Sequence, residues 1–187
     1  MTTKAKKISV RGTRDMVFTA LFAAILAAVA PFSVDIGPVP LTFATLIIYL
    51  ASIVLGAKRA VMAVLIYILL GGFGLPVFSR FQGGFHVIAG MTGGFLIGYI
   101  PLAFAVGFFA DKFRGNVFIY AVGIVIGTIL LYTVGVVWFM FLTGNTLMAA
   151  LAICVFPFLP GDALKAVAAC AIAPKLRKAI MQRNTAA

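Results

Sequence analysis

The chain has 187 residues, of which 64% are apolar and only 10% are charged, and its mean hydropathy is +1.18. A soluble domain of this size would be about half apolar and about a quarter charged, so the composition excludes an ordinary soluble protein. The net charge of +11 does not indicate nucleic-acid binding, because no basic face with interleaved aromatic residues accompanies it. The apolar runs are continuous and do not alternate with a period of two, which predicts an all-α integral membrane protein.

The first apolar run covers about residues 16–32 and follows a basic arm over residues 1–15. It contains Ala28-Val29-Ala30, a triplet that resembles the cleavage site of a signal peptide. Pro31 follows this triplet at once, and no long hydrophilic segment comes after it. We therefore expect a retained first helix.

The later apolar runs predict five further spans, interrupted by a glycine- and aromatic-rich connection over 74–90 and by PFLPGD at 157–162. Their ranges are about Leu41–Gly56, Ala60–Phe73, Met91–Ala110, Val117–Leu142 and, after a short segment that ends near Phe156, a sixth helix that begins at Asp162. These runs define a six-helix membrane domain over residues 16–180 and a tail over 181–187.

Basic residues cluster at the N-terminus, at 58–59, at 111–116 and at the C-terminus. With six spans, all four clusters lie on one side, which the positive-inside rule assigns to the cytoplasm together with both termini. Arg80 is the only basic residue in a loop on the opposite side, so we expect it to have a role other than setting the topology.

Small residues recur at intervals of four in three of the predicted helices. Gly90, Gly94 and Gly98 in the fourth span, and Gly123 and Gly127 in the fifth, predict close packing of helices within the chain. Ala20, Ala24 and Ala28 give the first helix a smooth face. That face could pack within the chain or against a partner protein.

Asp162 and Lys165 lie three residues apart inside an apolar run. Counted from Lys175 at the inner interface, they lie roughly 20 and 15 Å into a hydrocarbon core of about 30 Å. A charge that faces lipid at this depth costs about 2.5–3.5 kcal/mol, so we expect both to face a cavity entered from outside. Asp162 follows Pro160-Gly161 and is expected to cap the helix. Capping does not explain Lys165, which favours a binding role toward an anionic group.

Other residues that can reach the same outer face complete a predicted small-molecule pocket with few polar anchors. They are Arg80, Gln82, Thr92, Tyr99, Tyr132 and Trp138, together with the doublets Gly83-Gly84 and Gly93-Gly94, which would let the backbone approach a ligand. We expect no catalytic residue and no metal site, because His86 is the only histidine and no nucleophile or phosphate-loop motif occurs. The inventory favours a binding subunit over an enzyme.

Four stretches resemble the signature sequences of one family. They are SVDIGPVPLTFATL (33–46), GLPVFSRFQGGFHVIAGMTGGFLIGY (74–99), VGVVWF (134–139) and FPFLPGDALKA (156–166). They resemble BioY proteins, the biotin-binding S-components of energy-coupling factor (ECF) transporters. Met91 departs from the family pattern, which commonly has proline before Thr-Gly-Gly.

The resemblance implies a six-helix protein of a bacterial cell membrane that binds biotin, as transported ligand and without a cofactor, near its outer face. It implies a transmembrane coupling protein and two ATPases as partners. Ala20, Ala24 and Ala28 match the family's docking face, and residues 33–40, with Val34, Pro38 and Pro40, resemble its lid.

Biotin has two ureido N–H donors, an apolar thioether ring and a carboxylate tail. Asp162 could accept a ureido N–H, either Lys165 or Arg80 could pair with the carboxylate, and Tyr132 and Trp138 could pack on the rings.

Two alternatives remain open: an S-component for another small vitamin, and a self-sufficient small-solute transporter. An enzyme that uses Asp162 and Lys165 as acid and base is disfavoured, because no metal or nucleophile accompanies them.

Overall fold

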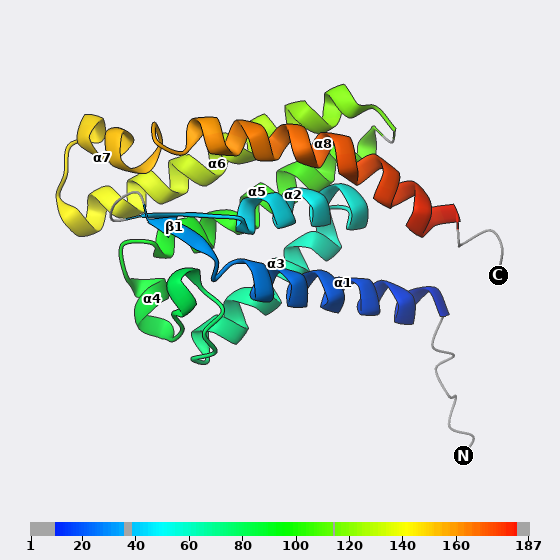
Figure 1. Ribbon diagram of the computed structural model, residues 1–187, viewed down its shortest axis with the longest axis horizontal. Coiled ribbons are helices and arrows are strands. Elements are labelled where there is room, and N and C mark those ends of the chain that lie inside the picture. The colour runs from blue at the N-terminus through cyan, green and yellow to red at the C-terminus, as the bar shows by residue number, and fades with distance from the viewer. Residues whose placement is uncertain (1–9, 36–38, 114, 183–187) are drawn as a thin grey trace, which may run out of the picture.

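The computed structural model describes residues 10–35, 39–113 and 115–182. Helices make up most of this part of the chain, as the continuous apolar runs predicted, and many of them run along the long axis of the molecule (Figure 1). The helices are α1 (Val10–Val29), α2 (Ala44–Leu55), α3 (Ala57–Gly72), the 3₁₀ turn η1 (Ser79–Phe81), α4 (Phe85–Ala89), α5 (Gly93–Lys112), α6 (Val117–Thr143), α7 (Leu147–Cys154) and α8 (Leu159–Gln182).

A two-stranded antiparallel ribbon joins α1 to α2, in the segment expected to form a lid. Its strands are β1 (Ser33–Asp35) and β2 (Pro40–Thr42), and Val34 pairs with Leu41 at its centre. The sequence did not predict these strands. Pro38, one of the predicted lid residues, lies outside the described residues.

Among the residues that the structure describes, three helices are long and apolar enough to cross a membrane: α1 over Gly12–Val29, α5, and α6. α7 and α8 form a further candidate crossing that bends by 51° at the break between them. α2 and α3 are shorter, with 12 and 16 residues. Length and composition therefore support a helical membrane protein with several apolar helices, whereas the count of six spans stays a prediction.

Glycines bring α5 and α6 into close contact, as their spacing predicted. A Cβ added at Gly94 would lie 2.2 Å from the Cβ of Trp138, and one added at Gly98 would lie 2.9 Å from a methyl group of Leu131. Without Cβ atoms at these positions the two helices approach closely, because dispersion contacts then extend along the backbone. This pair of helices supports one side of the pocket described below.

Charged side chains hold together the end of the molecule at which α1 begins and α8 ends (Figure 1). A carboxylate oxygen of Asp15 on α1 lies 2.7 Å from an Arg59 guanidinium nitrogen on α3. Arg14 donates a hydrogen bond of 2.5 Å to the backbone carbonyl of Ile180 on α8. The N-terminal and C-terminal helices are therefore tied at the same end.

A second cluster at this end joins α5 and α8 to the junction of α2 and α3. The buried Arg177 of α8 donates to the backbone carbonyl of Ala110 at 2.8 Å and lies 3.5 Å from Asp111. Asp111 in turn accepts a 3.0 Å hydrogen bond from the backbone N–H of Ala57, the first residue of α3. β1, α4 and α7 lie at the opposite end of the molecule, where the pocket is found (Figure 1).

Candidate ligand-binding site

A pocket of about 730 Å³, open space at its mouth included, lies between the ribbon, η1 and helices α5, α6 and α8. Small-molecule sites typically combine an apolar lining with a few placed polar groups. The walls follow this pattern, with apolar residues such as Phe95, Leu131 and Phe158 surrounding a small polar floor. The pocket therefore has the composition of a small-molecule site.

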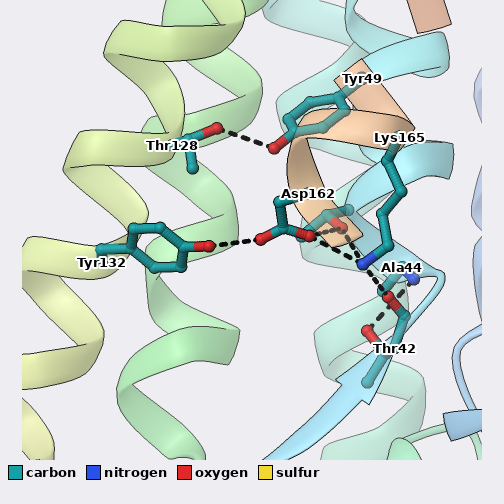
Figure 2. A network of polar contacts seen from close by, with 8 residues as sticks. Thr42, Ala44, Tyr49, Thr128, Tyr132, Asp162 and Lys165 are labelled. Atoms are coloured by element: carbon teal, nitrogen blue, oxygen red, sulfur yellow. Dashed lines mark hydrogen bonds and ion pairs between the residues drawn. The ribbon is translucent and has the colours of Figure 1, made fainter. Parts of the chain in front are cut away.

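Asp162 and Lys165 form a buried ion pair at the floor of this pocket (Figure 2), and each residue is 7% exposed. The Lys165 ammonium donates to Asp162 Oδ1 at 2.8 Å, to the backbone carbonyl of Thr42 at 2.6 Å and to Thr45 Oγ1 at 3.2 Å. An ammonium has three N–H donors, so all of them are used within the protein.

The Asp162 carboxylate is almost as fully occupied. Besides Lys165, its Oδ1 accepts from the Thr45 hydroxyl at 3.3 Å, and its Oδ2 accepts from the Tyr132 hydroxyl at 2.6 Å. A carboxylate has about four acceptor positions, so one position on Oδ2 is left for a ligand donor. The floor of the pocket is thus neutral as a unit and offers an acceptor but no spare N–H donor.

Four separate elements build this floor. Asp162 and Lys165 come from consecutive turns of α8, Tyr132 from α6 and Thr42 from β2 (Figure 2), and Thr45 comes from α2. The spacing of three residues places both charges on one face of α8, where they form an i, i+3 ion pair. The pair therefore ties α8 to the base of the ribbon.

The predicted capping role of Asp162 is wrong. α8 begins at Leu159, three residues before the predicted start, so Asp162 lies at the end of the first turn and its N–H donates to the carbonyl of Phe158 at 2.8 Å. Pro160 fits inside that turn because the N–H it lacks would have no helical partner there. The Asp162 carboxylate is directed at side chains of other elements.

The structure brings most of the other predicted site residues to the same pocket. Its lining includes Pro40, Arg80, Gln82, Thr92, Tyr99 and Tyr132 in addition to the ion pair. Tyr99 and the ion pair are buried, whereas Arg80 and Gln82 are exposed, which puts these two residues at the rim. Whether each contacts a ligand stays a prediction.

Several predicted residues lie outside the lining, namely Trp138, Val34 and the glycine doublets Gly83-Gly84 and Gly93-Gly94. Trp138 donates from Nε1 to the carbonyl of Gly90 at 2.9 Å and packs on Gly94, so it joins α6 to the start of α5. Gly83 lies so close to the backbone of Leu75 that a Cβ there would be 2.2 Å from that carbonyl oxygen. Val34 is exposed on β1.

Thr42 and Thr45 are the main residues that sequence reasoning missed. Both are buried, and both bind Lys165. They are the only two residues with hydrogen-bonding side chains in the segment from Val39 to Leu46. That isolation next to a predicted lid is a signal that could have found Thr45, whereas Thr42 binds Lys165 through its backbone carbonyl, which no side-chain pattern indicates.

Within the described ranges, no group of three or more His, Cys, Asp or Glu side chains could hold a metal ion.

The apolar helices and the pocket define an integral membrane protein of the class that binds a small solute. Within that class the chain belongs to the BioY family, whose sequence profile matches residues 1–182. The resemblance seen in the sequence is thereby confirmed.

Individual relatives agree with this assignment. The biotin transporter BioY of Thermotoga maritima is 39% identical over 123 residues, which cover 66% of this chain and 72% of that protein. The biotin transporter BioY of Rhizobium etli is 38% identical over 143 residues, covering 71% and 76%. The crystal structure of an S-component for biotin from an ECF-type ABC transporter has a TM-score of 0.84, 27% sequence identity and 95% coverage of both chains.

Proposed function

We propose that this chain is the membrane-embedded capture subunit for biotin uptake, and that it is not an enzyme. The observation that carries the proposal is the buried Asp162–Lys165 pair at the floor of a pocket with a largely apolar lining. Membership of the BioY family supports it, as do relatives named biotin transporters and a similar solved structure described as an S-component for biotin.

Biotin matches the donors and acceptors of this pocket. Its ureido N–H is a neutral donor and fits the remaining acceptor position on Asp162 Oδ2, beside Tyr132. Its carboxylate needs donors, and Lys165 has none left unless it releases Thr42 or Thr45. Arg80 is exposed at the rim. We therefore assign the ureido ring to the Asp162–Lys165 floor and the carboxylate to Arg80.

Titration of the purified chain with biotin and with biotin amide tests this assignment. Arg80→Ala should weaken biotin about tenfold or more and affect the amide much less, because only the carboxylate of biotin forms an ion pair with the guanidinium. Lys165→Ala should weaken both ligands, because it disturbs the shared floor. Lys112→Ala, which removes an exposed cation at the other end of the molecule, is the matched control.

The possible outcomes test the roles of Arg80 and Lys165 and the proposed function separately. Equal losses of biotin and its amide in Arg80→Ala would refute the role of Arg80 with the carboxylate. A loss confined to biotin in Lys165→Ala would move that role to Lys165. No binding of micromolar biotin by the wild-type chain would defeat the proposed function itself.

We further propose an ECF coupling protein and two ATPases as partners. The sequence contains no phosphate-binding loop, so ATP hydrolysis must be supplied by other chains. Ala20, Ala24 and Ala28 are exposed on α1, which supports this stripe as the docking face. The ribbon supports a lid, since Val39, Pro40 and Leu41 line the pocket.

We also propose that the protein lies in the cell membrane, crosses it six times and has both termini in the cytoplasm. The hydrogen bonds and ion pairs of Arg14, Arg59 and Arg177 support it, because they bring three of the four basic clusters to one end. Asp111 of the fourth cluster contacts Arg177 at that same end. The positive-inside rule assigns such an end to the cytoplasm.

A further inference from the structure

The wall of the pocket over Phe78–Gln82 has a backbone conformation that side chains rarely allow. Arg80 has φ 61° and Phe81 has φ 56°, so both lie in the left-handed region. A non-glycine residue in this region costs roughly 1–2 kcal/mol. Two such residues in succession persist only where contacts with the rest of the molecule hold them.

The base of this turn is fixed to α3. The buried Phe78 ring meets Tyr67 edge-on, with ring centroids 5.5 Å apart, and lies so close to Gly71 that a Cβ there would be 2.2 Å from it. The Phe78 N–H donates to the carbonyl of Gln82 at 2.9 Å and closes the turn. These contacts fix where the turn starts and ends, but not how its apex is oriented.

The apex is held by the segment that follows α1. The Arg80 N–H donates to the carbonyl of Pro31 at 3.1 Å. The Phe81 ring meets the Phe32 ring edge-on, with centroids 5.4 Å apart and an interplanar angle of 78°. Arg80 lines the pocket, whereas Phe81 is not part of the lining. Arg80 thus contributes to the pocket and Phe81 contacts the segment after α1, although both belong to the same strained turn.

Phe32 and Phe81 are 60% and 58% exposed. Their contact therefore adds little to the hydrophobic core, which makes stability of the fold a poor explanation for it. An edge-on aromatic pair contributes about 0.5–1.5 kcal/mol beyond area burial, which is comparable to the cost of one left-handed residue.

We propose that Phe32 and Phe81 are positioning residues that hold the left-handed turn against the end of α1 and so aim Arg80 at the mouth of the pocket. They would thereby help to select a ligand with a neutral polar head and an anionic tail. The identity of that ligand rests on the proposed function, whereas the restraint on the turn does not.

Binding measurements on the full chain test the effect on selectivity. Phe32→Ala and Phe81→Ala should each weaken biotin about tenfold and biotin amide less than about twofold, since Arg80 remains present but loses its orientation. Phe141→Ala removes an even more exposed ring from α6 and should change neither affinity. Equal losses for the two ligands, or no loss of biotin, would overturn the proposal.

Phe81→Gly distinguishes orientation of the backbone from direct ring contact with a ligand. Glycine adopts the left-handed region without steric cost, so Phe81→Gly should retain more of the preference for biotin over the amide than Phe81→Ala does. A glycine variant as unselective as the alanine variant would contradict the positioning role.

Trypsin cleavage after Arg80, followed by mass spectrometry without ligand, reads out the turn independently of biotin. Cleavage should be faster in Phe32→Ala and Phe81→Ala than in the wild type and Phe141→Ala, because a released turn fits a protease more easily. An unchanged rate would overturn the positioning role. Faster cleavage combined with equal losses of biotin and biotin amide affinity in Arg80→Ala would uphold the restraint and refute the carboxylate assignment.

Discussion

Lys165 stabilises the charge on Asp162, and Asp162 does the same for Lys165. Each charge is buried, and their mutual contact at 2.8 Å is supported by hydrogen bonds from or to Thr42, Thr45 and Tyr132. Loss of one partner leaves the other buried without compensation, which typically costs about 3–5 kcal/mol, whereas loss of both charges together often costs little.

We therefore expect Lys165→Met to lower the free energy of unfolding in detergent by about 3–5 kcal/mol. The double variant Asp162→Asn with Lys165→Met should recover most of this loss, because the asparagine oxygen can still accept from Tyr132. Denaturant unfolding of the two variants measures the difference. Biotin binding should be impaired in both, since the single variant removes the ammonium that holds Asp162 in place and the double variant also replaces the carboxylate acceptor.

Thr133→Val is the matched control, because its exposed hydroxyl donates only to the carbonyl of Ile129 in its own helix. A double variant less stable than Lys165→Met would show that the pair contributes more than charge compensation. That result would contradict the account of the floor as a neutral unit.

The ion pair could be predicted from the sequence, because two charges three residues apart on an apolar helix must share a face and need a partner. Its other contacts could not. Thr42 and Thr45 are more than 100 residues away along the chain, and their approach depends on the ribbon and on how α2 packs against α8. The capping prediction failed because the helix started one turn earlier than Pro160-Gly161 suggested.

At the scale of the elements, the contact between α5 and α6 depends on glycine. We expect Gly94→Val to lower the free energy of unfolding by about 1–3 kcal/mol, because its Cβ would meet that of Trp138 and force the helices apart. Thermal unfolding in detergent measures this loss. Biotin affinity should fall as well, since Leu131 on α6 and Tyr99 on α5 both line the pocket.

Gly12→Ala is the matched control, because a Cβ at this helical glycine meets nothing within 4 Å. It should leave stability unchanged or raise it slightly, since alanine favours helix more than glycine does. A Gly94→Val variant as stable as Gly12→Ala would show that the two helices adjust without cost.

The helices themselves follow from continuous apolar runs and from glycine and proline at their ends, so most of the fold could be predicted. The ribbon could not, because its strands have three residues each and show no alternation long enough to detect. Its register pairs Ser33 with Thr42 and helps to place the carbonyl that Lys165 binds. The contacts of Lys165 that could not be predicted therefore depend on the ribbon, the element that could not be predicted either.

At the scale of the whole molecule, the positions of the basic clusters predict which end faces the cytoplasm. A cysteine introduced by Asn145→Cys, between α6 and α7, should react with an impermeant maleimide added to intact cells. One introduced by Lys112→Cys should react only after permeabilisation. Cys154 and Cys170 are first replaced by alanine, so that the label reports the introduced thiol alone. Labelling of both sites from outside would contradict the proposed topology.

Docking to a coupling protein is expected to depend on a surface that the pocket does not use. Ala24 is exposed on α1, whereas its neighbour Ala23 is 2% exposed and packs in the core, so one face of this helix is held by the fold and the other is available. Ala24→Leu should leave biotin affinity within about twofold of wild type, because the outward face contributes nothing to the pocket lining.

The same variant should lose co-purification with the coupling protein and the two ATPases, because a leucine side chain prevents the close helix approach that small residues allow. Ala171→Leu adds the same bulk to an exposed position on α8 and should retain the complex. Retained assembly in Ala24→Leu would exclude this stripe as the docking face. Biotin uptake by the chain alone in ATP-free vesicles would instead favour the self-sufficient transporter, since no partner would then be needed to move the ligand.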